Sequence, residues 1–236
     1  SRTGPHRMFV TAARRFAENG FPSLRFDFTG RGESEGETSE ATIASMISDT
    51  HKAIEYALSQ TGVNKIILLG ICSGGKVAVA TAADNPKVSG LLLWSAEALG
   101  ELRSSSTRAR KSMFALRDYA RKLFRIETWK KIFTGNVNVD MVGKAVFSKE
   151  KPSDEDLGKE SVALGRFRSY RGPVLLVYGS NDPDTDLAAR NYIEFFRANG
   201  IENEFHEITG ANHSFYSLAW EKEVLDISAG WLERNY

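Results

Sequence analysis

The sequence predicts an α/β protein with a largely parallel sheet. Short apolar runs alternate along the chain with longer segments whose apolar residues fall at helical spacing. This alternation is typical of strands that are joined by crossover helices. The segment at residues 65–70 is apolar almost throughout rather than alternating, which favours a strand buried on both faces of such a sheet.

The expected elements follow one another in a regular order. Residues 8–19 have helical spacing and end at Asn19 and Gly20, which favour a left-handed stop. Residues 23–28 alternate and then break into a glycine turn, which predicts a strand. The remaining expected helices cover residues 43–58, 74–84, 187–199 and the segment from about 217, and the remaining expected strands cover residues 65–70, 88–95, 174–178 and 204–208.

Length and composition indicate one ordinary globular core. The 236 residues are 42% hydrophobic and 26% charged, and 31 Lys and Arg residues nearly balance 30 Asp and Glu residues. The chain therefore lacks the net field of a protein that binds nucleic acid or a membrane surface. Its single cysteine, Cys72, cannot form an intramolecular disulfide, and its apolar runs are too short to span a bilayer. We expect a cytoplasmic protein with no nucleic-acid or membrane partner.

The regular order is interrupted between two of the expected strands, at residues 97–170. We expect a core formed by residues 1–96 and 171–236, with a helical cap inserted at residues 97–170. Within that insertion, residues 101–133 hold ten Lys or Arg residues but only three acidic ones. A solvated helical face is the ordinary interpretation. The alternative is a basic rim that receives an anionic substrate, such as a CoA thioester or an acyl carrier protein.

The segment at residues 68–75 carries the strongest chemical signal, because it joins a strand directly to a helix. Small residues two positions before and after a central residue permit a strained turn that exposes the central side chain. Gly70 and Gly74 flank Cys72 in this way, whereas a turn centred on Ser73 would place Ile71 where a small residue is needed. The spacing favours Cys72 as a nucleophile, although a lone cysteine also packs well as a small apolar residue.

Two further residues follow expected strands in the order that an acyl-transfer triad on this sheet requires. Asp182 comes just after the strand at residues 174–178, and His213 comes just after the strand at residues 204–208. The carboxyl ends of parallel strands meet at one edge of a sheet, so we expect both side chains near Cys72. Asp184 and Asp186 remain alternatives to Asp182. Three other histidines fit less well, namely His6, His51 and His206.

Four motifs together resemble those of the α/β-hydrolase superfamily. They are a D-x-x-G-x-G-x-S turn at residues 27–34, the elbow at residues 70–74, a G-x-x-D loop at residues 179–182 and a histidine loop at residues 210–213. The resemblance implies an α/β-hydrolase fold, with helices on both faces of a mostly parallel sheet and an inserted cap. A cysteine at the centre of the elbow is similar to dienelactone hydrolase.

These residues predict a hydrolase that cleaves an ester or thioester through a covalent acyl-enzyme. Cys72 would be the nucleophile, His213 the base and Asp182 the acid that orients it, with the backbone N–H of Ser73 in the oxyanion hole. An acyltransferase that passes the acyl group to an amine or alcohol is one alternative. A noncatalytic ligand-binding protein on the same scaffold is another. We expect no cofactor and no metal.

One departure from the superfamily concerns the start of the sheet. The superfamily normally has a strand and a loop before the first helix, and that loop provides a second oxyanion donor. In this sequence the first helical segment begins almost at Ser1. We therefore expect that N-terminal strands are missing from this chain and that an upstream segment completes the sheet.

The segment at residues 70–77 also resembles a phosphate-binding loop, G-x-x-x-x-G-K-[ST]. The last position of that loop should offer a hydroxyl group to Mg²⁺, but Val77 stands there. A nucleotide-binding protein also gives no reason for the Asp182 and His213 loops. We therefore prefer the hydrolase interpretation.

Overall fold

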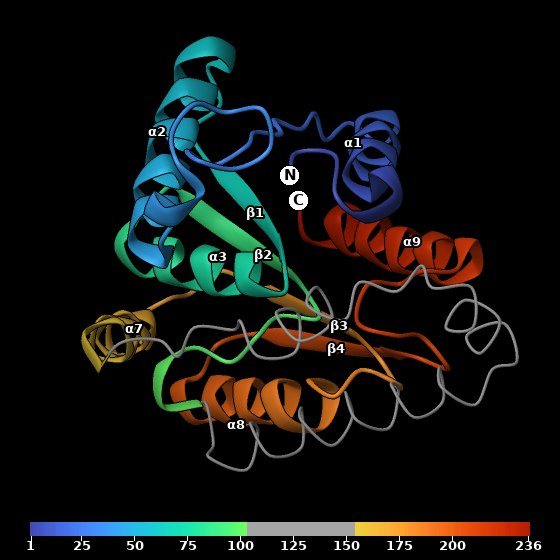
Figure 1. The fold of residues 1–236 in the computed structure, drawn as a ribbon. Helices are drawn as coiled ribbons and strands as arrows, with labels where there is room; N and C mark the ends of the chain where they lie inside the picture. Colours follow the sequence, from blue (N-terminus) through green and yellow to red (C-terminus); the bar gives the residue numbers. More distant parts are fainter. Residues whose placement is uncertain (103–153) are drawn as a thin grey trace, which may run out of the picture.

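The computed structural model describes residues 1–102 and 154–236, and its centre is a parallel sheet (Figure 1). Within these residues the sheet has four strands in the order β1-β2-β3-β4, and every neighbouring pair is parallel. The α/β prediction is therefore confirmed. The strands are β1 (Ile66–Ile71), β2 (Val88–Trp94), β3 (Val174–Gly179) and β4 (Asn203–Ile208).

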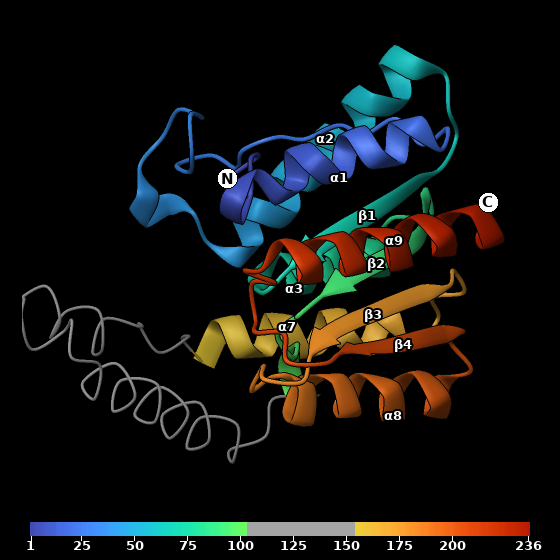
Figure 2. The ribbon, with the colours of Figure 1, turned by 90° about the vertical axis from the view of Figure 1, so that its right-hand side faces the viewer.

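Helices cover both faces of the sheet (Figures 1 and 2). Successive residues of a strand point to opposite faces, so Leu91 and Leu93 join one hydrophobic core, whereas Leu92 and Trp94 join the other. One face is covered by α1 (Met8–Glu18) and α9 (Leu218–Asn235), and the other by α2 (Ile43–Thr61), α3 (Ser73–Asp84), α7 (Asp154–Phe167) and α8 (Arg190–Asn199). Short helical turns lie at Pro5–Arg7, Thr38–Glu40, Gly100–Leu102 and Thr185–Ala189.

The expected strand at residues 23–28 is wrong, because this segment pairs with no strand among the described residues. Hydrogen bonds from backbone N–H groups to acidic side chains hold this segment and the turn after it. The carboxylate of Asp27 accepts hydrogen bonds from the backbone N–H groups of Arg2 and Glu33, and Asp49 accepts one from the N–H of Thr29 at 2.9 Å. A strand needs a ladder partner, and alternation in the sequence does not reveal whether a partner is present.

The strand that leads to Cys72 is an edge strand within the described part of the chain. β1 pairs only with β2, and its side chains are half-exposed, whereas those of β3 are buried along the whole strand. The N–H groups of Ile66 and Cys72 donate to β2 or its flanking residues. Backbone groups of successive residues face opposite edges, so the N–H groups of Ile67, Leu69 and Ile71 face the other edge of β1.

The helix α7 lies inside the segment that the sequence assigns to a cap, yet it packs as part of the main body. Leu164 and Phe167 join the hydrophobic core that α3 and α8 share. The ten basic residues of the predicted cap lie within residues 103–131, outside the described residues. The division into core and cap, and the basic rim, stay predictions.

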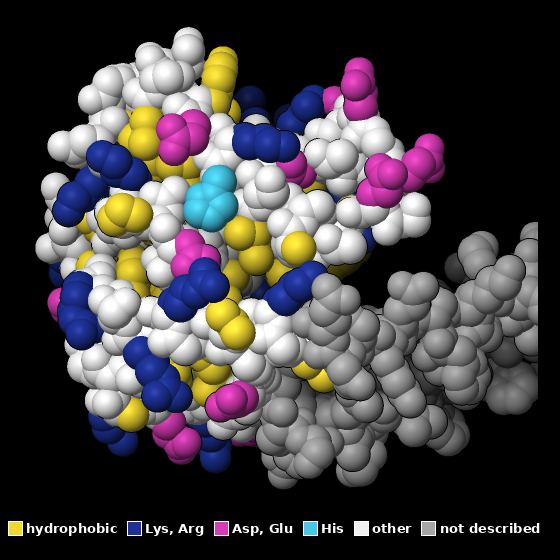
Figure 3. Space-filling view, turned by 90° about the vertical axis from the view of Figure 1, so that its left-hand side faces the viewer, with side chains coloured by type: hydrophobic (Ala, Val, Ile, Leu, Met, Phe, Trp, Pro, Cys, Tyr) yellow, Lys and Arg dark blue, Asp and Glu magenta, His cyan; other side chains and the backbone are white. Residues whose placement is uncertain are grey.

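The surface of the described part carries charges of both signs. Figure 3 shows the face that lies on the left in Figure 1. On this face, Lys and Arg side chains lie among Asp and Glu side chains. This mixture agrees with the near balance of charge in the sequence. Among the described helices, none is long and apolar enough to cross a membrane.

Candidate active site

The connection from β1 to α3 is a sharp turn centred on Cys72. Cys72 has φ 56° and ψ −126°, a conformation that side-chain-bearing residues rarely adopt. The turn requires Gly70, because a Cβ there would lie 2.3 Å from the carbonyl oxygen of Gly74. A Cβ at Gly74 would meet no atom within 4 Å, so only Gly70 has the steric cause that the sequence suggests. Cys72, not Ser73, occupies the strained position.

Ser73 is the first residue of α3, and its side chain is exposed. N–H groups in the first turn of a helix have no acceptor within that helix, and the helix dipole adds partial positive charge there. The backbone N–H of Ser73 is thus a suitable donor for a negatively charged oxygen beside Cys72.

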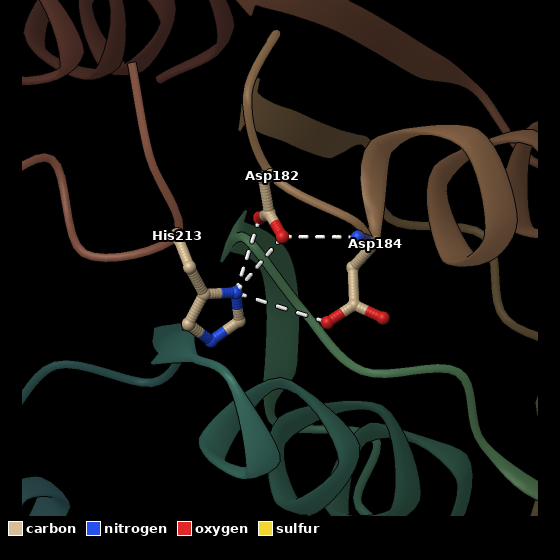
Figure 4. A group of neighbouring side chains, drawn as sticks. All are labelled: Asp182, Asp184 and His213. Atoms are coloured by element: carbon tan, nitrogen blue, oxygen red, sulfur yellow. Dashed lines mark hydrogen bonds and ion pairs between the residues drawn. The ribbon is translucent and has the colours of Figure 1, made fainter. Parts of the chain in front are cut away.

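Asp182 and His213 lie together at the carboxyl ends of β3 and β4 (Figure 4). The Nδ1 atom of His213 lies 3.1 Å from each carboxylate oxygen of Asp182. The Asp182 side chain is completely buried, whereas 32% of the His213 side chain is exposed. A buried carboxylate thus orients an imidazole whose other edge remains accessible.

Asp184 is a second carboxylate beside the same imidazole. Its Oδ2 lies 3.7 Å from Nδ1 of His213, and its backbone N–H donates to Asp182 at 2.9 Å (Figure 4). Asp186, the other alternative, pairs with Arg190 at the surface instead. The sequence treats Asp182 and Asp184 as competitors, but the structure places both at His213, with Asp182 in the hydrogen-bonding position.

The electrostatics of the pair follow from these contacts. Burial lowers the pKa of His213, but hydrogen bonds to Asp182 and Cys72 and the charges of both outweigh burial and raise that pKa to about 10. Burial raises the pKa of Asp182, but hydrogen bonds and charge from His213, with smaller contributions from Ser95 and Asp184, lower it overall. Both shifts favour a protonated His213 beside an ionised Asp182.

This coupling predicts a pH dependence of stability. A raised histidine pKa stabilises the fold fully below the unfolded value of about 6.5, and that contribution disappears as the pH rises through about 10. We expect Asp182→Asn to lower the free energy of unfolding by about 2 kcal/mol near pH 6, after allowance for the partly exposed imidazole. Denaturant titrations of both proteins should show this difference shrinking towards pH 10. A difference that grows with pH would contradict the assignment.

The same three residues also have the spacing of a cation site. Ligand atoms of Asp182, Asp184 and His213 all lie within 4.8 Å of one another. A hydrogen bond also accounts for this spacing, because the Nδ1–H group of His213 faces both carboxylates.

A second charged cluster lies beside Cys72, and the sequence analysis did not identify it. Glu97 Oε1 accepts a hydrogen bond from the Cys72 thiol at 3.8 Å, and Glu97 Oε2 lies 3.7 Å from Nζ of Lys76. Lys76 is buried and pairs with the buried Glu160 at 3.1 Å. The available signal was a lysine within the small apolar residues of the helix after the elbow. In the sequence this lysine suggested a phosphate-binding loop, but in the structure Lys76 forms ion pairs with Glu97 and Glu160.

The other three histidines lie elsewhere. His6 packs edge-on against Tyr216, His51 contacts Asn85, and His206 pairs with Glu204 on β4.

Comparisons with known proteins identify the family and the fold of this chain. Residues 6–143 match the model of a hydrolase family described as serine aminopeptidase, S33. An uncharacterised 31.7 kDa protein from the traX-finO intergenic region of Escherichia coli is 25% identical over 247 residues, covering 94% of this chain and 84% of that protein. The quorum-quenching protein AidA of Acinetobacter baumannii is 34% identical over 93 residues, covering 38% of this chain and 31% of AidA.

Solved structures share the fold at low sequence identity. A monoacylglycerol lipase from Paleococcus ferrophilus has a TM-score of 0.63 at 20% identity, covering 99% of this chain and 91% of the lipase. The esterase PF2001 of Pyrococcus furiosus has a TM-score of 0.64 at 16% identity, covering 96% of this chain and 75% of the esterase. With the family match over residues 6–143, this chain belongs to the serine aminopeptidase S33 family of hydrolases and has the α/β-hydrolase fold.

Proposed function

We propose that this protein hydrolyses an ester or thioester with Cys72 as the nucleophile. The observation that carries the proposal is the strained elbow conformation of Cys72 together with the hydrogen bond between His213 and the buried Asp182. The family name refers to a serine, whereas the residue at the centre of this elbow is Cys72. Fold neighbours that are named as a lipase and an esterase support an ester bond over a peptide bond.

Cys72, His213 and Ser73 each have a separate role in the proposed reaction. The reaction starts from neutral His213, which the raised pKa makes the minor form below about pH 10. The thiol proton of Cys72 moves to this imidazole, and Sγ forms a bond to the carbonyl carbon while the carbonyl electrons move to oxygen. The N–H of Ser73 donates to that oxygen. When the intermediate collapses, the bond to the leaving group breaks and the leaving group takes the proton from His213. Water then repeats these steps with the thioester, transfers a proton to His213, and restores the Cys72 thiol.

The acyl-enzyme is the test of this mechanism. We expect a short incubation with p-nitrophenyl acetate, followed by an acid quench, to add the mass of one acetyl group to the peptide that contains Cys72. The reason is that hydrolysis of the thioester is slowed at once by acid, when His213 can no longer accept a proton. Acetylation of Ser73 instead, or rapid turnover without acetylation at Cys72, would contradict the proposal. Transfer of the acetyl group to an added amine would identify the acyltransferase alternative.

We also propose that a further strand, from a segment upstream of Ser1, pairs with the open edge of β1 and brings a second oxyanion donor. The support is the half-exposed apolar face of β1 and the three N–H groups that face away from β2. Unpaired strand edges recruit another strand readily.

Amide hydrogen exchange tests the proposed strand. In the 236-residue chain we expect fast exchange at Ile67, Leu69 and Ile71, and slow exchange at Leu68 and Gly70, whose N–H groups face β2. A chain extended upstream should protect the first three amides. Equal protection of both sets in the 236-residue chain would contradict an open edge.

A further inference from the structure

The carboxylate of Glu97 lies next to the proposed nucleophile, Cys72. Glu97 follows β2, and its Oε1 is 3.8 Å from Sγ of Cys72. The Glu97 side chain is 22% exposed, so solvent reaches part of this carboxylate. The proposed reaction assigns no role to this carboxylate.

The position of Glu97 is fixed by its backbone. Its N–H donates to the carbonyl oxygen of Cys72 at 3.1 Å, and its own carbonyl oxygen accepts a hydrogen bond from the Tyr192 hydroxyl at 2.9 Å. The first bond joins the loop after β2 directly to the elbow. The Glu97 carboxylate therefore keeps its place relative to Sγ, as a binding group in a preorganised site does.

Lys76 fixes the side chain. Its ammonium group is buried and lies between Glu97 and Glu160, and Glu160 also accepts the backbone N–H of Gly100 at 3.0 Å. A buried ammonium group is stable only when carboxylates offset its lost hydration. Lys76 thus forms an ion pair with the Glu97 carboxylate, and a carboxylate accepts hydrogen bonds but does not donate them.

These contacts restrict the acyl group that the site accepts. An acyl group bonded to Sγ must lie next to Oε1 of Glu97, since the two atoms are 3.8 Å apart. Acylation of Sγ removes the thiol proton and with it the hydrogen bond to Glu97, and a methylene group offers no donor in its place. A hydroxyl or ammonium group on the carbon next to the carbonyl would donate to Glu97 in place of the thiol.

We propose that Glu97 is a specificity-determining residue that binds a hydrogen-bond donor, a hydroxyl or an ammonium group, on the acyl carbon next to the scissile carbonyl. The inference rests on the proposed function, since it assumes that Cys72 carries the acyl group. It narrows the substrate class from acyl groups in general to those with a polar substituent at this carbon.

Three thioesters with one leaving group test this assignment. We would measure kcat/KM for the ethyl thioesters of butanoic, 2-hydroxybutanoic and 2-aminobutanoic acid by the release of ethanethiol. A hydrogen bond to a charged group leads us to expect an advantage of about tenfold or more for both polar thioesters. Glu97→Gln should remove most of the ammonium advantage but less of the hydroxyl advantage, because the amide oxygen still accepts. Glu97→Ala should remove both.

Glu101→Gln is the matched control, because Glu101 is an exposed acid in the same loop and should leave all ratios unchanged. A wild-type preference for the butanoyl thioester, or an equal loss of all three activities in Glu97→Gln, overturns the assignment. The wild-type ratios suffice if the variants do not fold. If the wild type hydrolyses none of the three thioesters although p-nitrophenyl acetate acetylates Cys72, the role of Glu97 is overturned, as it is by turnover with equal kcat/KM. Failure of both the thioesters and the acetylation overturns the proposed function.

Discussion

Cys72→Ala should reduce hydrolysis of an activated ester to the background rate, a loss of at least about 10⁴-fold. The variant loses the sulfur that would carry the acyl group, and the neighbouring Ser73 is the exposed first residue of α3, outside the strained position. Hydrolysis should be measured with p-nitrophenyl acetate, and covalent labelling with iodoacetamide. Only the wild type should be both active and labelled at residue 72.

Ser73→Ala is the matched control for this prediction. It keeps the backbone N–H that the oxyanion hole needs, and its exposed side chain makes no contact that the mechanism uses. We expect activity within about threefold of the wild type. The reverse order, with Ser73→Ala inactive and Cys72→Ala active, would identify Ser73 as the nucleophile.

Asp182→Asn should have the second-largest effect, a decrease in kcat of about 10³- to 10⁴-fold, because an amide no longer stabilises the imidazolium or selects the required tautomer of His213. Asp184→Asn should cost only about tenfold, since its carboxylate lies 3.7 Å from Nδ1 and contributes charge rather than the hydrogen bond. Initial rates with saturating substrate would separate these effects.

Asp186→Asn controls for a general loss of acidic charge in this loop, because Asp186 pairs with Arg190 at the surface. It should leave kcat unchanged. Thermal melts of all three variants would exclude unfolding as the cause. If Asp184→Asn proves the more damaging change, Asp184 and not Asp182 is the acid that orients His213.

The order of elements could be predicted because hydrophobic spacing is local. The strand at Ile66–Ile71, the helix that follows it and the strand at Val174–Gly179 were expected almost at their observed bounds. Each needs only a short apolar segment followed by residues that permit a turn. The prediction of a strand at residues 23–28 was wrong because a strand also needs a neighbouring strand to pair with, and local spacing does not reveal that neighbour.

The candidate site divides in the same way. The sequence by itself indicated the elbow at Cys72, where Gly70 is a local steric requirement, and it pointed to Asp182 and His213 by their positions after strands. Only the tertiary structure decided that Asp184 shares the imidazole and that Glu97 lies against the thiol. These residues meet through the packing of separate strands and helices, and no spacing along the chain records a contact that depends on the third dimension.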